Sequence, residues 1–267
     1  MGEQALSERK YDEAAGFYAK AIELEPDNAG NYYKLYRVHK RMRKLEVALG
    51  DLSKAVEVCR SEAGGGSCTK GNEAMYLMDR AKLFMGLGQC GLAWEDMKVC
   101  RDIGSGSDAK VLQLMADVEM CAAEIERATA AFMVGDWSDA RRYLDLAIPR
   151  TERALDLIFM RAQAAYHEFD FYGVVSDTGK VLKFEGKHMD ALQLRGDAYT
   201  RLGEHDMALK HYKEALKFDP EHKGCKKGHK FVKAITKYDK RGDKSMKEGD
   251  HEQAIKYWWQ AINHDVT

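Results

Sequence analysis

The chain has 267 residues, a formal net charge of -1 and an apolar content of 45%. This composition excludes a disordered tail, and the near-neutral charge gives no reason to expect a nucleic-acid or membrane partner. Only three prolines occur, so long uninterrupted helices are expected. No apolar run is long enough to span a bilayer, and the first residues lack the pattern of a signal peptide.

The first predicted elements are two helix pairs of similar sequence. In the first pair, Ala14, Tyr18 and Ala21 have the spacing of a second helix, and Pro26 marks its end. Ala48 follows Ala14 by 34 residues and opens the second helix of the next pair. A repeat of this length predicts a helical array in which each pair packs on its neighbour.

Later pairs keep the pattern but not always the spacing. The small residue that opens each second helix recurs at Ala93, Ala140, Val174, Ala208 and Ala254. Three steps exceed 34 residues. A glycine-rich insertion at 61–67 accounts for one, and the other two contain long amphipathic stretches, 108–134 and 223–248, that each predict one long helix.

The sixth unit, 189–222, carries the pattern most clearly. Gly196 and Ala208 are small where two helices cross closely, Gly203 lies in the turn between them, and Pro220 ends the second helix. These residues are typical of the tetratricopeptide repeat (TPR).

We therefore predict an all-α fold, a TPR superhelix of about seven repeats in three sub-arrays joined by long helices. The sub-arrays are 1–107, with three repeats of which the first is truncated, 108–222, with three repeats and a long first helix, and 223–267, the truncated start of the third. Because the first and last units look incomplete, we expect this chain to be a fragment of a longer protein.

In a TPR array the first helix of each pair lines the concave face, where polypeptides bind. The inward positions of the first units form an apolar, Met-rich groove, and flexible thioethers suit a surface that accepts many sequences. The alternative is that these methionines pack against neighbouring helices. The predicted client-binding residues are Leu6, Tyr33, Arg37, Met75, Met78, Lys82, Met85 and Ile125.

The segment 218–226, continuing through 231–233, resembles the junction before the third sub-array of the endoplasmic-reticulum DnaJ/TPR co-chaperones of the kinase-inhibitor type. The resemblance covers essentially the whole chain. It implies a co-chaperone of the endoplasmic reticulum lumen, linked to the unfolded protein response, that holds unfolded clients and passes them to a BiP-type chaperone through a J domain. No His-Pro-Asp triplet of a J domain occurs in this sequence.

The cysteines bear on this compartment. The resemblance implies a cysteine at position 215 that bonds Cys225, but Ala215 stands here, which weakens a lumenal assignment against a cytoplasmic one. Cys59 and Cys68 flank the glycine-rich insertion, and they either form a disulfide or remain two free thiols.

Some TPR domains bind differently, through a clamp of side chains that holds the C-terminal carboxylates of heat-shock chaperones. That clamp needs Lys, Arg and Asn side chains on successive first helices. The matching positions of the first three units hold Glu3, Lys34, Met75 and Asp79, so the clamp is absent.

The alternative function is a scaffold that docks one folded partner, for example a protein kinase. Its surface would be an acidic groove of the last units, with Asp190, Gln193, Asp197, Asp239 and Asp243, or one of two basic clusters, at 34–44 and 223–233. We expect those basic clusters to be solvated helix faces.

No enzyme, cofactor or metal site is expected. No nucleophile, base and acid form a recognisable set, and no Cys-x-x-Cys pair suggests zinc. The glycines at 86–91 match a dinucleotide fingerprint, but they fall in a predicted helix–helix turn rather than after a strand.

Overall fold

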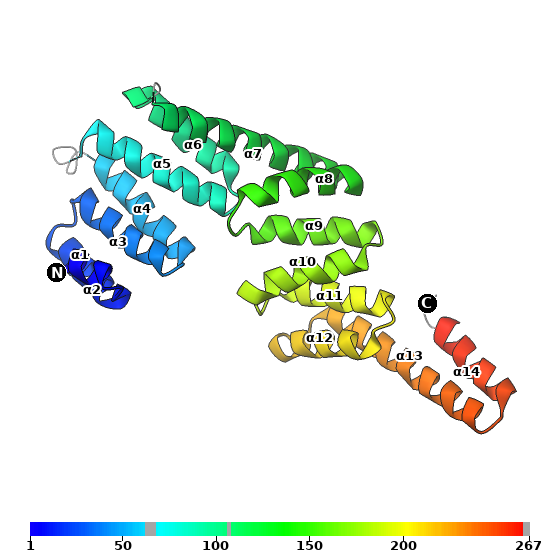
Figure 1. Cartoon of the computed structure of the whole chain (residues 1–267). Coiled ribbons are helices and arrows are strands. Elements are labelled where there is room, and N and C mark those ends of the chain that lie inside the picture. The colour runs from blue at the N-terminus through cyan, green and yellow to red at the C-terminus, as the bar shows by residue number, and fades with distance from the viewer. Residues whose placement is uncertain (62–67, 106–107, 264–267) are drawn as a thin grey trace. The chain divides into compact units, whose positions relative to one another are not determined.

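The computed structural model describes residues 1–61, 68–105 and 108–263, so all but the first residue of the insertion predicted at 61–67 lies outside the described residues. The described residues form helices that succeed one another as antiparallel pairs, with no strand among them (Figure 1). Fourteen α-helices within these described ranges make seven pairs, as the repeat pattern predicts. The all-α prediction is confirmed.

The chain divides into two compact units. Unit 1 comprises 1–127 with 145–154, and unit 2 comprises 128–144 with 155–267. The prediction of three sub-arrays, 1–107, 108–222 and 223–267, stays a prediction beside this division.

Unit 1 begins with three helix pairs. They are α1 (Gly2–Ser7) with α2 (Tyr11–Leu24), α3 (Ala29–Arg41) with α4 (Leu45–Arg60), and α5 (Lys70–Gly86) with α6 (Cys90–Cys100). A short π-helical segment, η1 (Arg101–Ser105), follows α6, and a 3-10 turn, η2 (Ile148–Arg150), closes the unit. The core of unit 1 runs from α3 to the first half of α7, with Leu52, Leu77 and Val118 fully buried.

Unit 2 is built mainly from three helix pairs. They are α9 (Leu155–His167) with α10 (Phe171–Phe184), α11 (Met189–Arg201) with α12 (His205–Phe218), and α13 (Lys223–Lys247) with α14 (His251–Asn263). The remaining pair, α7 (Ala109–Val134) and α8 (Trp137–Ala147), contributes residues to both units. Both long helices expected from the irregular repeat steps, α7 and α13, are therefore present.

In the sixth repeat, the close packing of α11 against α12 explains why small residues stand where the two helices cross. A Cβ atom on Gly196 would lie 2.6 Å from Cε1 of Tyr212, so only glycine allows α11 and α12 to approach this closely. The hydroxyl of Tyr212 donates a 2.6 Å hydrogen bond to Asp197. Helix α12 ends at Phe218, immediately before Asp219 and Pro220.

Each turn inside a helix pair contains one residue with a left-handed backbone. Four of these residues are glycines, at positions 88, 135, 203 and 249, and the other three are Arg9, Arg43 and Phe169. The amide of the following residue donates to a carbonyl five residues back, for example Glu204 N to Tyr199 O at 2.9 Å. This arrangement is the Schellman motif, which favours glycine because that residue has no Cβ to clash.

Candidate functional site

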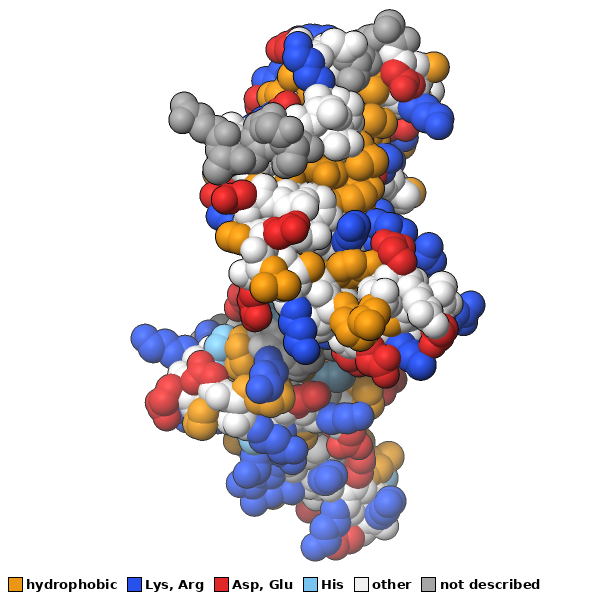
Figure 2. All heavy atoms as spheres, turned by 90° about the vertical axis from the view of Figure 1, so that its left-hand side faces the viewer, with side chains coloured by type: hydrophobic (Ala, Val, Ile, Leu, Met, Phe, Trp, Pro, Cys, Tyr) orange, Lys and Arg blue, Asp and Glu red, His pale blue; other side chains and the backbone are white. Residues whose placement is uncertain are grey.

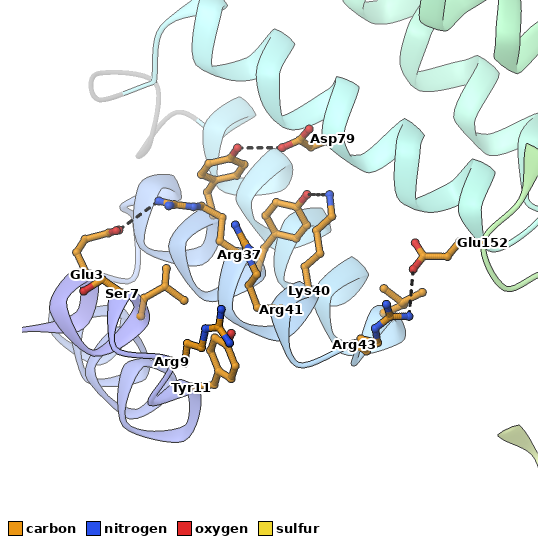
Figure 3. Close-up of a pocket in the computed structure, with 14 residues that line it drawn as sticks. Glu3, Ser7, Arg9, Tyr11, Arg37, Lys40, Arg41, Arg43, Asp79 and Glu152 are labelled. Atoms are coloured by element: carbon orange, nitrogen blue, oxygen red, sulfur yellow. Dashed lines mark hydrogen bonds and ion pairs between the residues drawn. The ribbon is translucent and has the colours of Figure 1, made fainter.

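A cavity of about 820 Å³ opens in unit 1 beside α1, α3 and the middle of α5. Three of the eight predicted client-binding residues, Leu6, Tyr33 and Arg37, line it. They are joined there by tyrosines and cations that were not among the predicted client-binding residues, although the last three belong to the basic cluster at 34–44: Arg9, Tyr11, Tyr36, Lys40, Arg41 and Arg43. Figure 3 shows the cations reaching the cavity from α3 and from the turns at either side.

The tyrosines form an aromatic wall that is held by one carboxylate. The Tyr33 ring lies 4.8 Å from Tyr76 and 5.3 Å from Tyr36, centroid to centroid. The Tyr33 hydroxyl donates a 2.9 Å hydrogen bond to Asp79. Burial, and then this hydrogen bond, raise the pKa of Tyr33, so the phenol stays neutral and can present an apolar face.

The remaining predicted residues lie outside this cavity. Met78 and Lys82 line a second, shallower hollow of about 420 Å³ beside Gln113 and Asp117 of α7. Met75 has 39% of its surface exposed, whereas Met85 is half-buried against the core of unit 1. Ile125, near the middle of α7, is half-buried. The structure thus brings together two groups of the eight, and their role in client binding stays a prediction.

A second cavity, of about 640 Å³, lies in unit 2 between α11 and α13. Gln193, Asp197 and Asp239 of the predicted acidic groove line it, beside Phe231 and Ile235. Burial raises the pKa of Asp197, and the hydrogen bonds from Tyr212 and Gln193 oppose that rise. The groove is therefore less acidic in character than the sequence indicates, because its central carboxylate is already bonded and its floor is apolar.

Two disulfides lie in unit 1. One joins Cys59 and Cys68, with Cα atoms 5.3 Å apart, and is one of the two alternatives left open by the sequence. The other joins Cys90 at the start of α6 to Cys121 of α7, with Cα atoms 5.9 Å apart, and the sequence analysis did not foresee it. Cys100 and Cys225 are buried thiols outside these two disulfides.

Three further features concern metal ions, membranes and charged partners. Among the described residues, no group of three or more His, Cys, Asp or Glu side chains is arranged to hold a metal. Every helix in the described part of the chain is too short or too polar to cross a membrane. Figure 2 shows Lys and Arg side chains gathered at the lower end of the face that it presents. The second predicted basic cluster, 223–233, lies in the first half of α13.

The fold and its repeat geometry define a class. Residues 190–222 match the family model of the tetratricopeptide repeat. The crystal structure of the P58(IPK) TPR domain superposes on all of this chain and 72% of that chain with a TM-score of 0.76, at 21% sequence identity. The chain has the TPR fold.

Curated relatives narrow the class. DnaJ protein P58IPK homolog B of Oryza sativa subsp. japonica is 25% identical over 89% of this chain and 41% of its own length. DnaJ homolog subfamily C member 3 of Homo sapiens is 26% identical over 89% of this chain and 45% of its own length. The chain is a relative of the TPR-containing DnaJ proteins of the P58IPK and DnaJ C3 family, as the junction at 218–226 predicts. It spans less than half the length of these relatives.

Proposed function

We propose that this chain binds unfolded polypeptides along the first-helix side of unit 1, and that it is the client-holding part of a DnaJ-type co-chaperone. The observation that carries the proposal is the open cavity of unit 1, which presents neutral tyrosine faces and cations; α5 of the same unit also exposes Met75, outside the cavity. Kinship with DnaJ proteins supports a chaperone role. Delivery of clients to a BiP-type chaperone belongs to the same proposal and requires a J domain outside these residues.

The compartment we propose is the lumen of the endoplasmic reticulum. Two disulfides in unit 1 support it, because disulfides persist in oxidising compartments and are rare in the cytosol. The cytoplasmic alternative predicts that the same four cysteines carry free thiols in the cell. Alkylation of the protein in intact cells, followed by mass spectrometry, separates the two.

The client-binding proposal is tested by suppression of aggregation of a chemically denatured reporter protein, without ATP. Met75→Glu together with Met78→Glu places charge on the groove and should abolish suppression. Met133→Glu is the matched control, because Met133 is exposed at the end of α7 in unit 2 and is not part of the proposed groove. Circular dichroism checks that each variant is folded, and Met75→Glu alone serves if the half-buried Met78 cannot accept charge.

If the folded variant with both Met75→Glu and Met78→Glu still suppresses aggregation, the assignment of client binding to this groove is wrong.

The second candidate function is a scaffold that docks one folded partner, such as a protein kinase, and the cavity lined by Asp197, Phe231 and Asp239 favours it. A scaffold would bind that partner with fixed stoichiometry and leave the aggregation of the reporter protein unchanged.

A further inference from the structure

In two of the turns inside helix pairs, arginine occupies the left-handed position that favours glycine, although the repeat fold does not require arginine there. At this position Arg9 has a φ of 60° and Arg43 has a φ of 57°, whereas four other repeats have glycine there. An L side chain there costs about 1 kcal/mol relative to glycine, because its Cβ crowds the backbone. Both arginines line the same cavity of unit 1. Strained side chains that converge on one cavity point to a function there.

The cations of this cavity are not all paired. Nη1 of Arg37 lies 3.2 Å from Oε1 of Glu3, and Lys40 donates a 3.0 Å hydrogen bond to the hydroxyl of Tyr36. Arg43 reaches Glu152 only at 3.9 Å, and both side chains are largely exposed. Among the described residues, no carboxylate lies within ion-pair distance of Arg9 or Arg41. Figure 3 shows these two guanidinium groups at the cavity without a dashed partner.

The charge balance of the walls limits what the cavity can hold. Five cations face three carboxylates, those of Glu3, Asp79 and Glu152. The Asp79 carboxylate is further occupied by Tyr33 and Lys82. The small surplus of positive charge suits one or two anionic groups, whereas the three carboxylates repel a polyanion such as a nucleic acid.

Apolar surface adjoins these cations. Leu6 and the partly exposed rings of Tyr11 and Tyr33 line the same cavity, whereas the ring of Tyr36 is buried. A planar guanidinium matches a carboxylate with two parallel hydrogen bonds, and aromatic faces accept apolar side chains. The cavity therefore suits a polypeptide segment in which an Asp or Glu stands beside an apolar residue.

We propose that Arg9, Arg41 and Arg43 make this cavity an acidic-peptide subsite, which selects client segments with a carboxylate next to apolar residues. The inference rests on the proposed function, which it makes more specific. The subsite differs from the clamp for chaperone C-termini, because the clamp positions hold Glu3, Lys34, Met75 and Asp79 here. The cations of the subsite come instead from two turns and the last turn of α3.

The test is a matched pair of short fluorescent peptides, identical in Leu and Tyr content, one with Glu and the other with Gln at the same positions. Fluorescence anisotropy should give an affinity for the Glu peptide about tenfold higher at low ionic strength, since one charge-assisted hydrogen bond accounts for that factor. The difference should shrink at physiological salt because the site is open.

Variants separate the subsite from the fold. Arg9→Gly should unfold at a higher temperature, because it relieves the left-handed strain, and yet lose most of the preference for the Glu peptide. Phe169→Gly is the matched control: it relieves the same strain in unit 2, where Phe169 has a φ of 62°, and should leave peptide binding unchanged. Arg41→Gln removes a charge without touching a turn and should also weaken the preference.

The outcomes are distinguishable. If the wild-type chain binds neither peptide, the proposed function fails and this inference falls with it. Equal affinity for the two peptides, or an undiminished preference in Arg9→Gly and Arg41→Gln, overturns the acidic subsite and leaves client binding intact. Displacement of the Glu peptide by a single-stranded RNA at equal concentration would assign the cations to nucleic acid and overturn the proposal.

Discussion

At the scale of the residue, any side chain other than that of glycine at the left-handed position of a turn raises the free energy of the folded state. Phe169 occupies it between α9 and α10, with 80% of its surface exposed and only an edge contact to Phe171, with ring centroids 6.2 Å apart. The side chain therefore recovers little packing energy for the strain of its backbone.

Phe169→Gly should raise the free energy of unfolding of unit 2 by about 1 kcal/mol, because the left-handed conformation no longer carries a Cβ. Equilibrium denaturation in urea measures it through the midpoint at unchanged slope. A loss of stability would show instead that the exposed ring contributes more to packing than its surroundings indicate.

His211 occupies a position at which two other repeats have aspartate. In unit 1 Arg80 pairs with Asp96, and in unit 2 Arg161 pairs with Asp177, each through two hydrogen bonds of 2.6 to 2.9 Å. At the corresponding place, Arg195 donates a 3.2 Å hydrogen bond to Nε2 of His211. The imidazole must be neutral to accept that bond.

Burial, and then the charge of Arg195, lower the pKa of His211 below its usual value of 6.5. Between the two pKa values the unfolded chain binds more protons than the folded chain, so stability falls as the pH drops through 6.5 towards the folded pKa. His211→Asp restores the arginine–aspartate pair and should remove this part of the acid sensitivity.

Melting temperatures of wild type and His211→Asp at pH 7.5 and at mildly acidic pH, about one unit below the usual histidine pKa, check the prediction. The wild type should lose more on acidification than the variant. An equal loss in both proteins would mean that other histidines dominate the response.

At the scale of the element, the same arginine–aspartate pair joins the two helices of a repeat. In the pair of Arg80 and Asp96, the aspartate side chain is 7% exposed and the arginine side chain 18%. Removing one partner leaves a charge in a poorly hydrated site, whereas replacing both by apolar groups removes the problem as well as the bond.

Arg80→Met should lower the free energy of unfolding of unit 1 by roughly 2 kcal/mol, discounted from the fully buried case because Arg80 keeps some contact with water. The double variant Arg80→Met with Asp96→Leu should recover most of that loss. A double-mutant cycle in urea gives the coupling energy. Additive losses would show that the two side chains act independently.

At the scale of the whole molecule, the two compact units differ in covalent chemistry. Unit 1 holds both disulfides, while the cysteine of unit 2, Cys225, is a buried thiol whose pKa burial raises to about 11. A thiol with that pKa is neutral and poorly reactive at physiological pH. Redox conditions should therefore act on unit 1 alone.

Reduction should destabilise unit 1 by about 3 to 4 kcal/mol for the 31-residue Cys90–Cys121 loop in the chain-entropy account, a shift on the order of 10 °C, and leave unit 2 in place. Hydrogen exchange resolved by segment, with and without reductant, measures both units in one sample. Cys121→Ser should reproduce the effect under oxidising conditions, and Cys225→Ser is the control. Equal loosening of both units on reduction would contradict the prediction.

The sequence by itself determined the class of fold, the seven helix pairs and the two long helices, because these depend on local signals. Pro220 stops a helix, Gly203 permits a left-handed turn, and small residues such as Gly196 recur wherever paired helices cross. Even the turn position of Arg9 and Arg43 was readable, since each stands five residues before the small residue of the next helix, as Gly203 stands before Ala208.

Only the tertiary structure decided which side chains share a cavity and which cysteines meet. The eight predicted client-binding residues share one periodicity, yet Tyr33 and Met78 lie in different hollows, because Tyr33 shares its hollow with residues of α1 whereas Met78 shares its hollow with residues of α7. Cys90 opens α6 whereas Cys121 lies in α7, a long helix that departs from the repeat spacing, so no periodic pattern relates them. Contacts between distant segments depend on how helices pack, and repeat spacing does not contain that information.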